Sequence, residues 1–224
     1  MHNTLELDGV ILDFDTNRVL QDIYLKSETG KITGLLGRNG TGKSCIMNII
    51  FGELSPSDKS VRLNGKTLYD SSRNPEDMRY LTQFEFIPKW LSVKQVFRYF
   101  ELDFEDFAFI FPDFEQFYFD KIRDLSGGER RIIEAYSILA SKTKFCMLDE
   151  PFSQIMPIYV EAMKQLILRE KANKGILVTD HLYKHIIDIC DSIYVIDHGQ
   201  TYLTKSVQDL EKHEYIRSIS PQTV

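Results

Sequence analysis

A glycine-rich loop between an apolar strand and an apolar helix constrains this chain more than any other feature. The expected strand Lys31–Leu36 comes before the loop, and the expected helix Ser44–Phe51 follows it and is closed by Gly52. The loop matches the pattern of a phosphate-binding loop, with the residues Gly37, Arg38, Asn39, Gly40, Thr41, Gly42, Lys43 and Ser44. Its glycines let backbone N–H groups converge on an anion at the positive end of the helix dipole. The sequence therefore predicts an α/β domain that holds a nucleotide phosphate at this loop.

Two carboxylates end a second apolar strand, Phe145–Leu148. Asp149 and Glu150 are adjacent, so on an extended chain their side chains point in different directions. Open α/β sheets bind ligands at the carboxyl ends of their strands, which is where these acids stand. We expect Lys43 to bridge the β- and γ-phosphates, and Ser44 and Asp149 to face Mg²⁺. Glu150 can then orient or deprotonate an attacking water.

A turn of small residues opens another expected helix after Leu125. Its residues are Ser126, Gly127, Gly128 and Glu129. Such a turn forms a second anion-binding helix N-terminus in a chain that already has one. A head-to-tail dimer accounts for both, because each nucleotide then lies between the phosphate-binding loop of one chain and this turn of the other. For the turn taken alone, an ordinary serine N-cap is the alternative explanation.

The rest of the pattern separates into three stretches. The first 80 or so residues indicate short strands and turns: Leu5–Phe14, Val19–Leu25, and Ser60–Leu63 before the hairpin-turn pair Asn64-Gly65. After Gly127 the chain alternates between helices and strands: a helix to about Ala140, the strand Phe145–Leu148, the helix Val160–Lys171, the strand Gly175–Val178, a helix near Tyr183–Cys190 and the strand Ser192–Ile196. This alternation predicts a parallel sheet covered by helices.

The stretch between these two regions has a composition of its own. Eleven of the fifteen phenylalanines lie between Phe84 and Phe119, and seven acids without a Lys or Arg lie between Arg98 and Lys121. We expect an inserted helical segment here. Packing of the segment's own core is the first explanation for so many aromatic residues, and a surface for a partner protein is the second.

Composition excludes several classes of protein. The 224 residues include 27 Lys and Arg against 33 Asp and Glu, a formal charge of −6, which argues against a basic nucleic-acid binder. The sequence has no apolar run long enough to span a membrane, and its N-terminus is acidic where a signal peptide is basic. The three scattered cysteines, Cys45, Cys146 and Cys190, predict free thiols in a reducing compartment. We expect a cytoplasmic protein.

Taken together, these motifs resemble those of the ATP-binding cassette (ABC) ATPase family from about Leu5 to the region of Leu210. Gly37 to Ser44 stands as the Walker A motif, Cys146 to Asp149 as Walker B, and Leu125 to Glu129 as the signature motif. The resemblance implies a P-loop NTPase core, a mainly parallel sheet flanked by helices, with an N-terminal antiparallel β subdomain and a short inserted α-helical subdomain. Residues 1–224 then form one domain: the β subdomain and P-loop region (1–83), the helical subdomain with the signature motif (84–140), and the remainder (141–224).

The resemblance also assigns residues to a site for ATP and Mg²⁺, with Glu150 as the catalytic acid that follows Walker B. Gln83 matches a glutamine that touches Mg²⁺ or the attacking water, and His181 matches a histidine near the γ-phosphate. Phe14, 23 residues before Gly37, matches an aromatic residue that stacks on adenine.

Two residues depart from the family pattern. Met156 stands where the D-loop that follows Walker B usually has an aspartate, which affects communication across the dimer. Cys45 stands where a threonine usually donates to the α-phosphate, and a thiol is a weaker donor.

The resemblance implies the cytoplasmic ATPase subunit of a bacterial-type ABC transporter. Such a subunit works as a homodimer or heterodimer and drives a separate permease subunit on the inner face of the membrane, without inserting into the membrane or binding nucleic acid. One alternative is a soluble ABC ATPase of translation or DNA maintenance, whose usual second cassette, long insertions and basic patches are lacking here. The other is a nucleotide-binding regulator without turnover, which the presence of Glu150 and His181 disfavours.

Overall fold

A six-stranded sheet lies at the centre of the molecule, and the computed structural model describes residues 2–69, 74–204 and 210. The strands run in the order β10-β9-β3-β8-β7-β6, and all neighbours except β10 and β9 are parallel. Their bounds are β3 (Ile32–Gly37), β6 (Met78–Leu81), β7 (Phe145–Asp149), β8 (Gly175–Thr179), β9 (Ser192–Asp197) and β10 (Gln200–Thr204). β3, β7 and β8 are buried along their whole length, as strands are when both faces of a sheet are covered.

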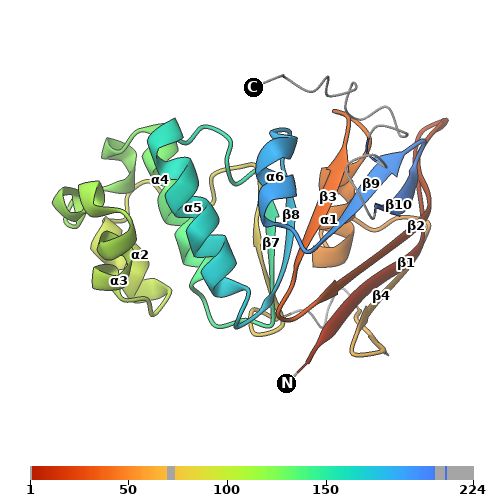
Figure 1. Cartoon of the computed structure of the whole chain (residues 1–224), viewed down its shortest axis with the longest axis horizontal. Coiled ribbons are helices and arrows are strands. Elements are labelled where there is room, and N and C mark those ends of the chain that lie inside the picture. The colour runs from red at the N-terminus through yellow and green to blue at the C-terminus, as the bar shows by residue number, and fades with distance from the viewer. Residues whose placement is uncertain (1, 70–73, 205–209, 211–224) are drawn as a thin grey trace, which may run out of the picture.

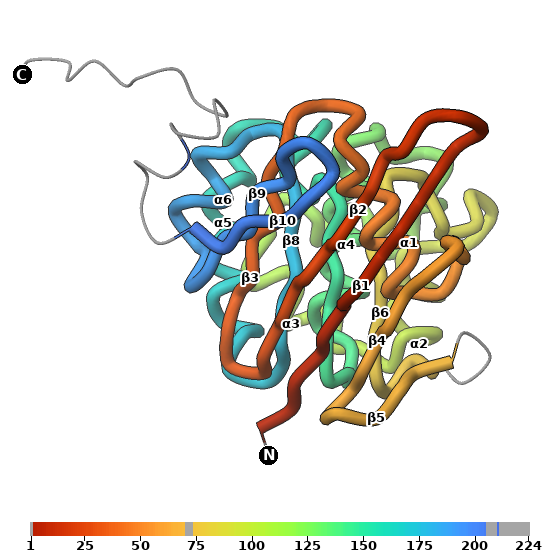
Figure 2. The backbone as a smooth tube through the Cα atoms, turned by 90° about the vertical axis from the view of Figure 1, so that its right-hand side faces the viewer, coloured from red at the N-terminus to blue at the C-terminus, as the bar shows by residue number. Residues whose placement is uncertain are grey.

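A second, antiparallel sheet lies across one face of the central sheet (Figure 2). Its order is β2-β1-β4-β5, with β1 (Thr4–Phe14), β2 (Asn17–Glu28), β4 (Asp58–Leu63) and β5 (Lys66–Thr67). Asn64 and Gly65 join β4 to β5 with φ angles of 52° and 75°, the left-handed pair that a two-residue hairpin turn needs. The predicted fold class, an α/β core with an N-terminal antiparallel part, is therefore confirmed.

Helices cover the two faces of the central sheet unequally. α4 (Gly127–Leu139), α5 (Pro157–Glu170) and α6 (Tyr183–Ile189) lie on one side, away from the antiparallel strands (Figure 1), whereas α1 (Lys43–Phe51) packs with those strands. β7 separates two hydrophobic cores: Cys146 and Leu148 face the core of α4 to α6, and Phe145 and Met147 face the other. Within the described residues, no helix is both long enough and apolar enough to cross a membrane.

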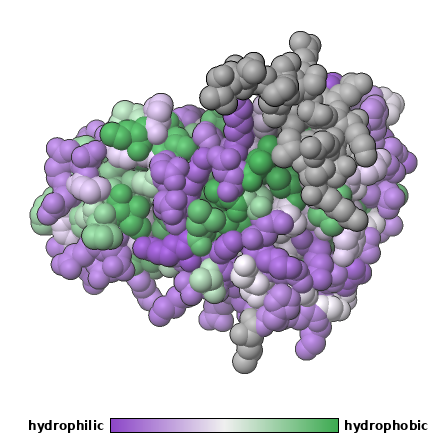
Figure 3. Space-filling model, in the orientation of Figure 1, coloured by the Kyte–Doolittle hydropathy of each residue, from purple (hydrophilic) through white to green (hydrophobic). Residues whose placement is uncertain are grey.

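The phenylalanine-rich segment folds into the short helices α2 (Val93–Tyr99) and α3 (Phe104–Ile110), followed by 3-10 turns at Pro112–Phe117 and Ile122–Asp124. Phe97, Phe107, Phe111 and Phe114 are buried, and Phe107 stacks edge-on against Tyr136 of α4 with ring centres 4.8 Å apart. Most of these rings therefore pack a core. The most exposed are Phe84 (81%), Phe109 (87%) and Phe119 (74%). Figure 3 shows apolar side chains at the surface of the helical part of the molecule, on the left, with hydrophilic side chains between them.

The structure differs from the predicted elements at two places. α5 begins at Pro157 rather than at Val160, because proline has the φ angle of a first helical residue and needs no N–H partner there. β10 was not expected, and it pairs with β9 at the edge of the central sheet. Most of the terminal segment 206–224 lies outside the described residues, although Leu210 is buried in the core of the helical side.

Candidate active site

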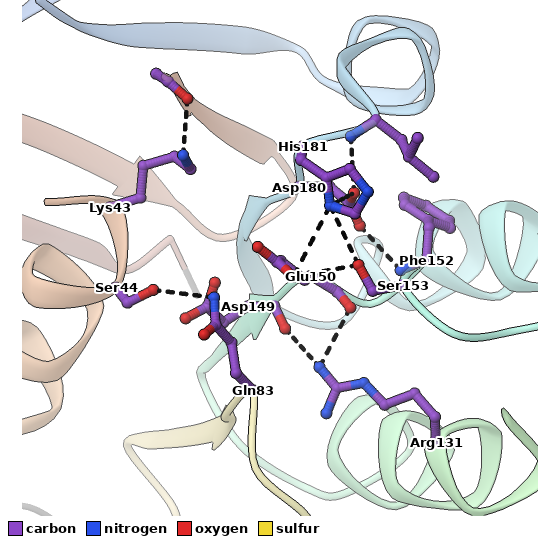
Figure 4. Close-up of polar contacts among 12 residues, drawn as sticks. Lys43, Ser44, Gln83, Arg131, Asp149, Glu150, Phe152, Ser153, Asp180 and His181 are labelled. Carbon is purple, nitrogen blue, oxygen red and sulfur yellow. Dashed lines mark hydrogen bonds and ion pairs between the residues drawn. The ribbon is translucent and has the colours of Figure 1, made fainter. Parts of the chain in front are cut away.

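Four parallel strands end at one edge of the central sheet, and each leads into candidate residues. β3 continues into the phosphate-binding loop, β6 leads to Gln83, β7 ends at Asp149 and β8 leads to His181. Parallel neighbours present their carboxyl ends side by side, so residues far apart in the sequence meet here. Figure 4 shows Lys43, Ser44, Gln83, Asp149 and Glu150 on this edge.

The phosphate-binding loop has a backbone shape that glycine permits. Gly40 and Gly42 have φ angles of 82° and 101°, which other residues adopt only with strain. A Cβ atom at Gly42 would also lie 2.7 Å from Cδ2 of Leu20 in β2. Gly42 is the N-cap of α1, so the backbone N–H groups of the first turn of α1 are available to an anion.

Lys43 is held over this loop and is only 8% exposed. Its Nζ donates to the carbonyl oxygens of Gly37 at 2.7 Å and of Arg38 at 3.1 Å. Burial lowers the pKa of the Lys43 ammonium, while the negative charges of Glu150 and Asp149 oppose that shift. Phosphate oxygens are stronger acceptors than carbonyl oxygens, so the ammonium can exchange these bonds for a phosphate.

Ser44, Gln83 and Asp149 form a cluster of oxygen-bearing side chains. Gln83 Nε2 donates to Ser44 Oγ at 3.2 Å, and Tyr80 donates its hydroxyl to Asp149 Oδ2 at 3.2 Å. Burial raises the pKa of Asp149, and the nearby charge of Glu150 adds to the rise. Asp149 Oδ1 is buried and has no hydrogen-bond partner among the described residues. A hydroxyl, an amide oxygen and an unpartnered carboxylate oxygen are hard donors, so the cluster fits Mg²⁺.

Glu150, Ser153 and His181 form the second cluster. Ser153 Oγ donates to Glu150 Oε2 at 3.2 Å and lies 3.3 Å from His181 Nδ1. Glu150 has a φ angle of 54°, an uncommon conformation for glutamate, and its backbone N–H donates to Thr179 O at 2.8 Å. The side chains of Glu150 and His181 are 27% and 47% exposed, so water can reach both.

Asp180 connects the loop that follows β7 to the loop that follows β8. It is fully buried, and its carboxylate accepts the backbone N–H groups of Phe152 at 3.0 Å and Leu182 at 2.9 Å. Burial raises the pKa of Asp180, and these two hydrogen bonds oppose the rise. Oδ1 of Asp180 lies 3.5 Å from His181 Nδ1, so the carboxylate also orients the imidazole ring.

The Ser126–Glu129 turn is fixed inside its own chain. Ser126 Oγ accepts the N–H of Glu129 at 3.3 Å, and Glu129 Oε2 accepts the N–H of Ser126 at 2.7 Å, a reciprocal cap of α4. A Cβ atom at Gly128 would lie 2.5 Å from the carbonyl oxygen of Gln154, so the turn rests directly on the segment after Glu150. The N-cap explanation therefore applies within the chain, while Ser126 remains exposed to a second chain.

Three further candidates lie around these clusters. Phe14 is 49% exposed at the end of β1, beside the start of β2, whose Leu20 contacts the phosphate-binding loop. Cys45 lies in the first turn of α1, and burial raises the pKa of its thiol. Met156 is 49% exposed and is the N-cap residue of α5, without a side-chain hydrogen bond to the helix.

Two residues that contact the site were not identified from the sequence. Tyr80 contacts Asp149, and Arg131 of α4 donates to the carbonyl oxygen of Asp149 at 2.5 Å (Figure 4). A signal existed for Arg131, because it shares a helix face with the apolar residues Ala135 and Ile138. A charged residue on an apolar face indicates a buried partner.

Comparisons with known proteins agree with this geometry. The family model described as "ABC transporter" matches residues 20–153. The lipopolysaccharide export system ATP-binding protein LptB of Escherichia coli (strain K12) is 29% identical over 232 residues, which cover 96% of each chain. The hemin import ATP-binding protein HmuV of Pseudomonas entomophila (strain L48) is 29% identical over 223 residues, 91% of this chain and 87% of the relative.

A solved structure gives the same result for the fold. It is titled "Structure of ATP binding subunit of ABC transporter", and it superposes with a TM-score of 0.78 at 21% identity, covering 96% of this chain and 95% of its own. The family model spans more than half of the sequence, including the phosphate-binding loop and both carboxylates. The chain therefore belongs to the ABC transporter family, as an ATP-hydrolysing subunit.

Proposed function

We propose that ATP hydrolysis takes place at the carboxyl edge of the central sheet, with Glu150 as the base for the attacking water. The observation that supports this most directly is the Glu150–Ser153–His181 cluster, which lies on the same edge as the phosphate-binding loop. In this proposal the loop N–H groups and Lys43 hold the phosphates. Glu150 accepts a proton from water, while Ser153 keeps its carboxylate in place and His181 lies near the γ-phosphate.

Ser44, Gln83 and Asp149 would hold Mg²⁺ in this site. When bound, the ion supplies positive charge to the phosphate oxygens on which negative charge accumulates. The unpartnered, buried Oδ1 of Asp149 supports this assignment, since a buried acceptor without a partner is costly unless something else satisfies it.

We further propose that two cassettes sandwich each nucleotide. The exposed Ser126 and the Gly127-Gly128 backbone of one chain would face the phosphates held by its partner, and Phe14 would stack on adenine. Met156 would lie close to the boundary between the two cassettes, because the segment that contains it contacts the Ser126–Glu129 turn through Gln154. A homodimer and a heterodimer both fit this arrangement.

A groove beside Gln83 is the proposed contact with a membrane subunit. It has a volume of about 780 Å³, and its apolar walls include Phe86, Ile87, Trp90, Tyr99 and Phe100. Trp90 and Tyr99 are 66% and 79% exposed, more than packing within the chain would require. We propose that a cytoplasmic helix of a permease lies in this groove, which would place the chain on the inner face of the membrane. The relatives are named for export and for import, so no transported substrate is assigned.

Two substitutions test the catalytic assignment. Glu150→Gln should bind ATP normally but lose roughly 10²–10⁴-fold in turnover, the usual effect of removing a general base. Lys43→Ala should instead weaken ATP binding itself. Glu161→Gln, which alters an exposed glutamate of α5, is the matched control and should change neither. Hydrolysis by Glu150→Gln at the wild-type rate would show that another group is the base.

A further inference from the structure

Two charged side chains of α4, Arg131 and Glu134, are buried although the proposed reaction uses neither. They are 7% and 2% exposed, respectively. Their nearest charged atoms, Arg131 Nη1 and Glu134 Oε2, lie 3.9 Å apart, which is too far for a hydrogen bond. Burying such a pair is expensive, and replacing it with apolar residues often leaves a protein equally stable. Stability alone is therefore a poor explanation for the pair.

Arg131 contacts the backbone on both sides of the proposed site. Its guanidinium donates to the carbonyl oxygens of Asp149 at 2.5 Å and Glu150 at 3.2 Å (Figure 4), and to that of Thr82, next to Gln83, at 2.6 Å. The peptide unit of Glu150 has a strained, left-handed conformation that needs external support. Arg131 provides part of that support, so a shift of α4 changes the position of the catalytic carboxylate.

Glu134 contacts the groove described above. Its Oε1 accepts the backbone N–H groups of Phe86 at 2.8 Å and Ile87 at 3.2 Å, and both residues line the groove. Its Oε2 is buried without a hydrogen-bond partner among the described residues. Residues three apart on a helix are neighbours, so Glu134 and Arg131 move together with α4.

We propose that the Arg131–Glu134 pair couples the groove to the catalytic carboxylate. A helix that enters the groove displaces Phe86 and Ile87, and Glu134 passes the displacement to α4 and through Arg131 to the Glu150 peptide. Coupling of binding sites is reciprocal, so ATP binding must also alter the groove through the same pair. This inference rests on the proposed function, because the coupling connects the proposed ATP site to the proposed docking groove.

The chain contains its own reporter for this coupling. Trp90 is its single tryptophan. It lines the groove, and 66% of it is exposed. In the full chain, ATP with Mg²⁺ should change Trp90 fluorescence. Arg131→Met and Glu134→Met should bind ATP within a few-fold of the wild-type affinity, measured by calorimetry, yet lose most of that fluorescence change. Arg131→Met should also hydrolyse ATP about tenfold more slowly, because an unsupported Glu150 is misplaced.

A matched control separates coupling from stability. Lys174 is another buried cation, 2% exposed, and it donates to the carbonyl oxygens of Leu139, the last residue of α4, and of Ser141 just after it, at the end of the helix far from the proposed site. Lys174→Met should lower the unfolding temperature like the other variants but keep the full Trp90 response. Arg131→Lys keeps the buried charge and reaches fewer carbonyl oxygens, so its response should be intermediate even if the methionine variants fold poorly.

The outcomes are distinct. A full Trp90 response in Arg131→Lys and in whichever methionine variants fold, or no response in a wild-type chain that binds and hydrolyses ATP, overturns the coupling. A wild-type chain that does not bind or hydrolyse ATP overturns the proposed function instead.

Discussion

The hydroxyl of Ser153 joins the proposed catalytic base to the histidine beside it, donating to Glu150 Oε2 at 3.2 Å and lying 3.3 Å from His181 Nδ1. The hydroxyl has one hydrogen, and Glu150 receives it, so His181 Nδ1 must be the donor toward Ser153. In a neutral imidazole with its hydrogen on Nδ1, Nε2 is an acceptor. Glu150 and His181 are themselves 3.8 Å apart, so the serine makes the link.

Ser153→Ala should therefore slow ATP hydrolysis about tenfold, the low end of what a lost hydrogen bond to a charged group costs. ATP affinity should stay unchanged, because the hydroxyl of Ser153 bonds to Glu150 and His181 and not to the residues proposed to hold the phosphates. Ser153→Thr keeps the hydroxyl and is the control. Steady-state kinetics on the three proteins decide the matter, and equal turnover in all of them would contradict the proposed link.

Tyr80→Phe should raise the Mg²⁺ concentration needed for half-maximal ATPase activity several-fold. The phenol donates to Oδ2 of Asp149 and so orients the carboxylate, and its loss leaves a buried acceptor free to turn away. Titrating the variant with Mn²⁺ by electron paramagnetic resonance measures the affinity without turnover. Tyr194→Phe removes another buried tyrosine hydroxyl, in β9, four strands away in the sheet, and should leave the metal requirement as it is.

Ser126→Arg should block hydrolysis while the single chain still binds ATP. Ser126 is exposed at the start of α4, where the proposed second chain brings its nucleotide, and a bulky arginine would keep the two chains apart. Light scattering with ATP and Mg²⁺ in a Glu150→Gln background measures dimer formation directly. If Ser126→Arg lowers the ATP affinity of the monomer as much as Lys43→Ala does, the turn acts within its own chain.

Met156→Asp should raise the ATPase activity of a homodimer several-fold by restoring the carboxylate that the family has in the D-loop. Met156 is 49% exposed and its side chain makes no cap of α5, so the change costs the isolated chain little. A hydrogen bond to a charged group limits the gain to about ten- to a hundred-fold. If the natural dimer contains a different cassette, the gain should appear only in that heterodimer. No gain in either setting would mean that the carboxylate is dispensable.

The phenylalanine-rich segment gives a prediction for stability. Phe107→Ala should lower the free energy of unfolding by about 3–5 kcal/mol, since its ring is fully buried among other rings. Phe109→Ala, two residues away on α3 and 87% exposed, should change it by about 0.5 kcal/mol or less. Urea unfolding of both variants tests this, and similar losses would place Phe109 in a buried contact.

Much of this molecule could be predicted from local sequence patterns. The strand before the phosphate-binding loop, the strand that ends at Asp149 and the Asn64-Gly65 turn are set by local apolar runs and glycine conformations, and each lies where it was expected. The order of strands in the sheet then places Gln83 beside Ser44, at a separation of 39 residues.

Other features depend on contacts that no local pattern contains. Tyr80 is one of several tyrosines in strand-like sequence, and only the pairing of β6 with β7 places its hydroxyl beside Asp149. The apolar helix face of Arg131 indicates a buried partner, but the carbonyl oxygens that it meets are identified only once α4 is packed beside β7. The edge strand β10 has an ordinary composition, and its pairing with β9 follows from the turn at His198 and Gly199.

The tight fit of Gly128 against Gln154 affects how substitutions in the signature motif are interpreted. Position 128 rejects any side chain inside a single chain, because a Cβ atom there would meet a backbone oxygen at 2.5 Å. Intolerance at Gly128 therefore says nothing about a second chain. At Gly127 the nearest atom to such a Cβ lies 3.8 Å away, so alanine fits the isolated fold. Of the two glycines, only Gly127 can report on the nucleotide of a partner, and a loss of activity there reflects assembly rather than folding.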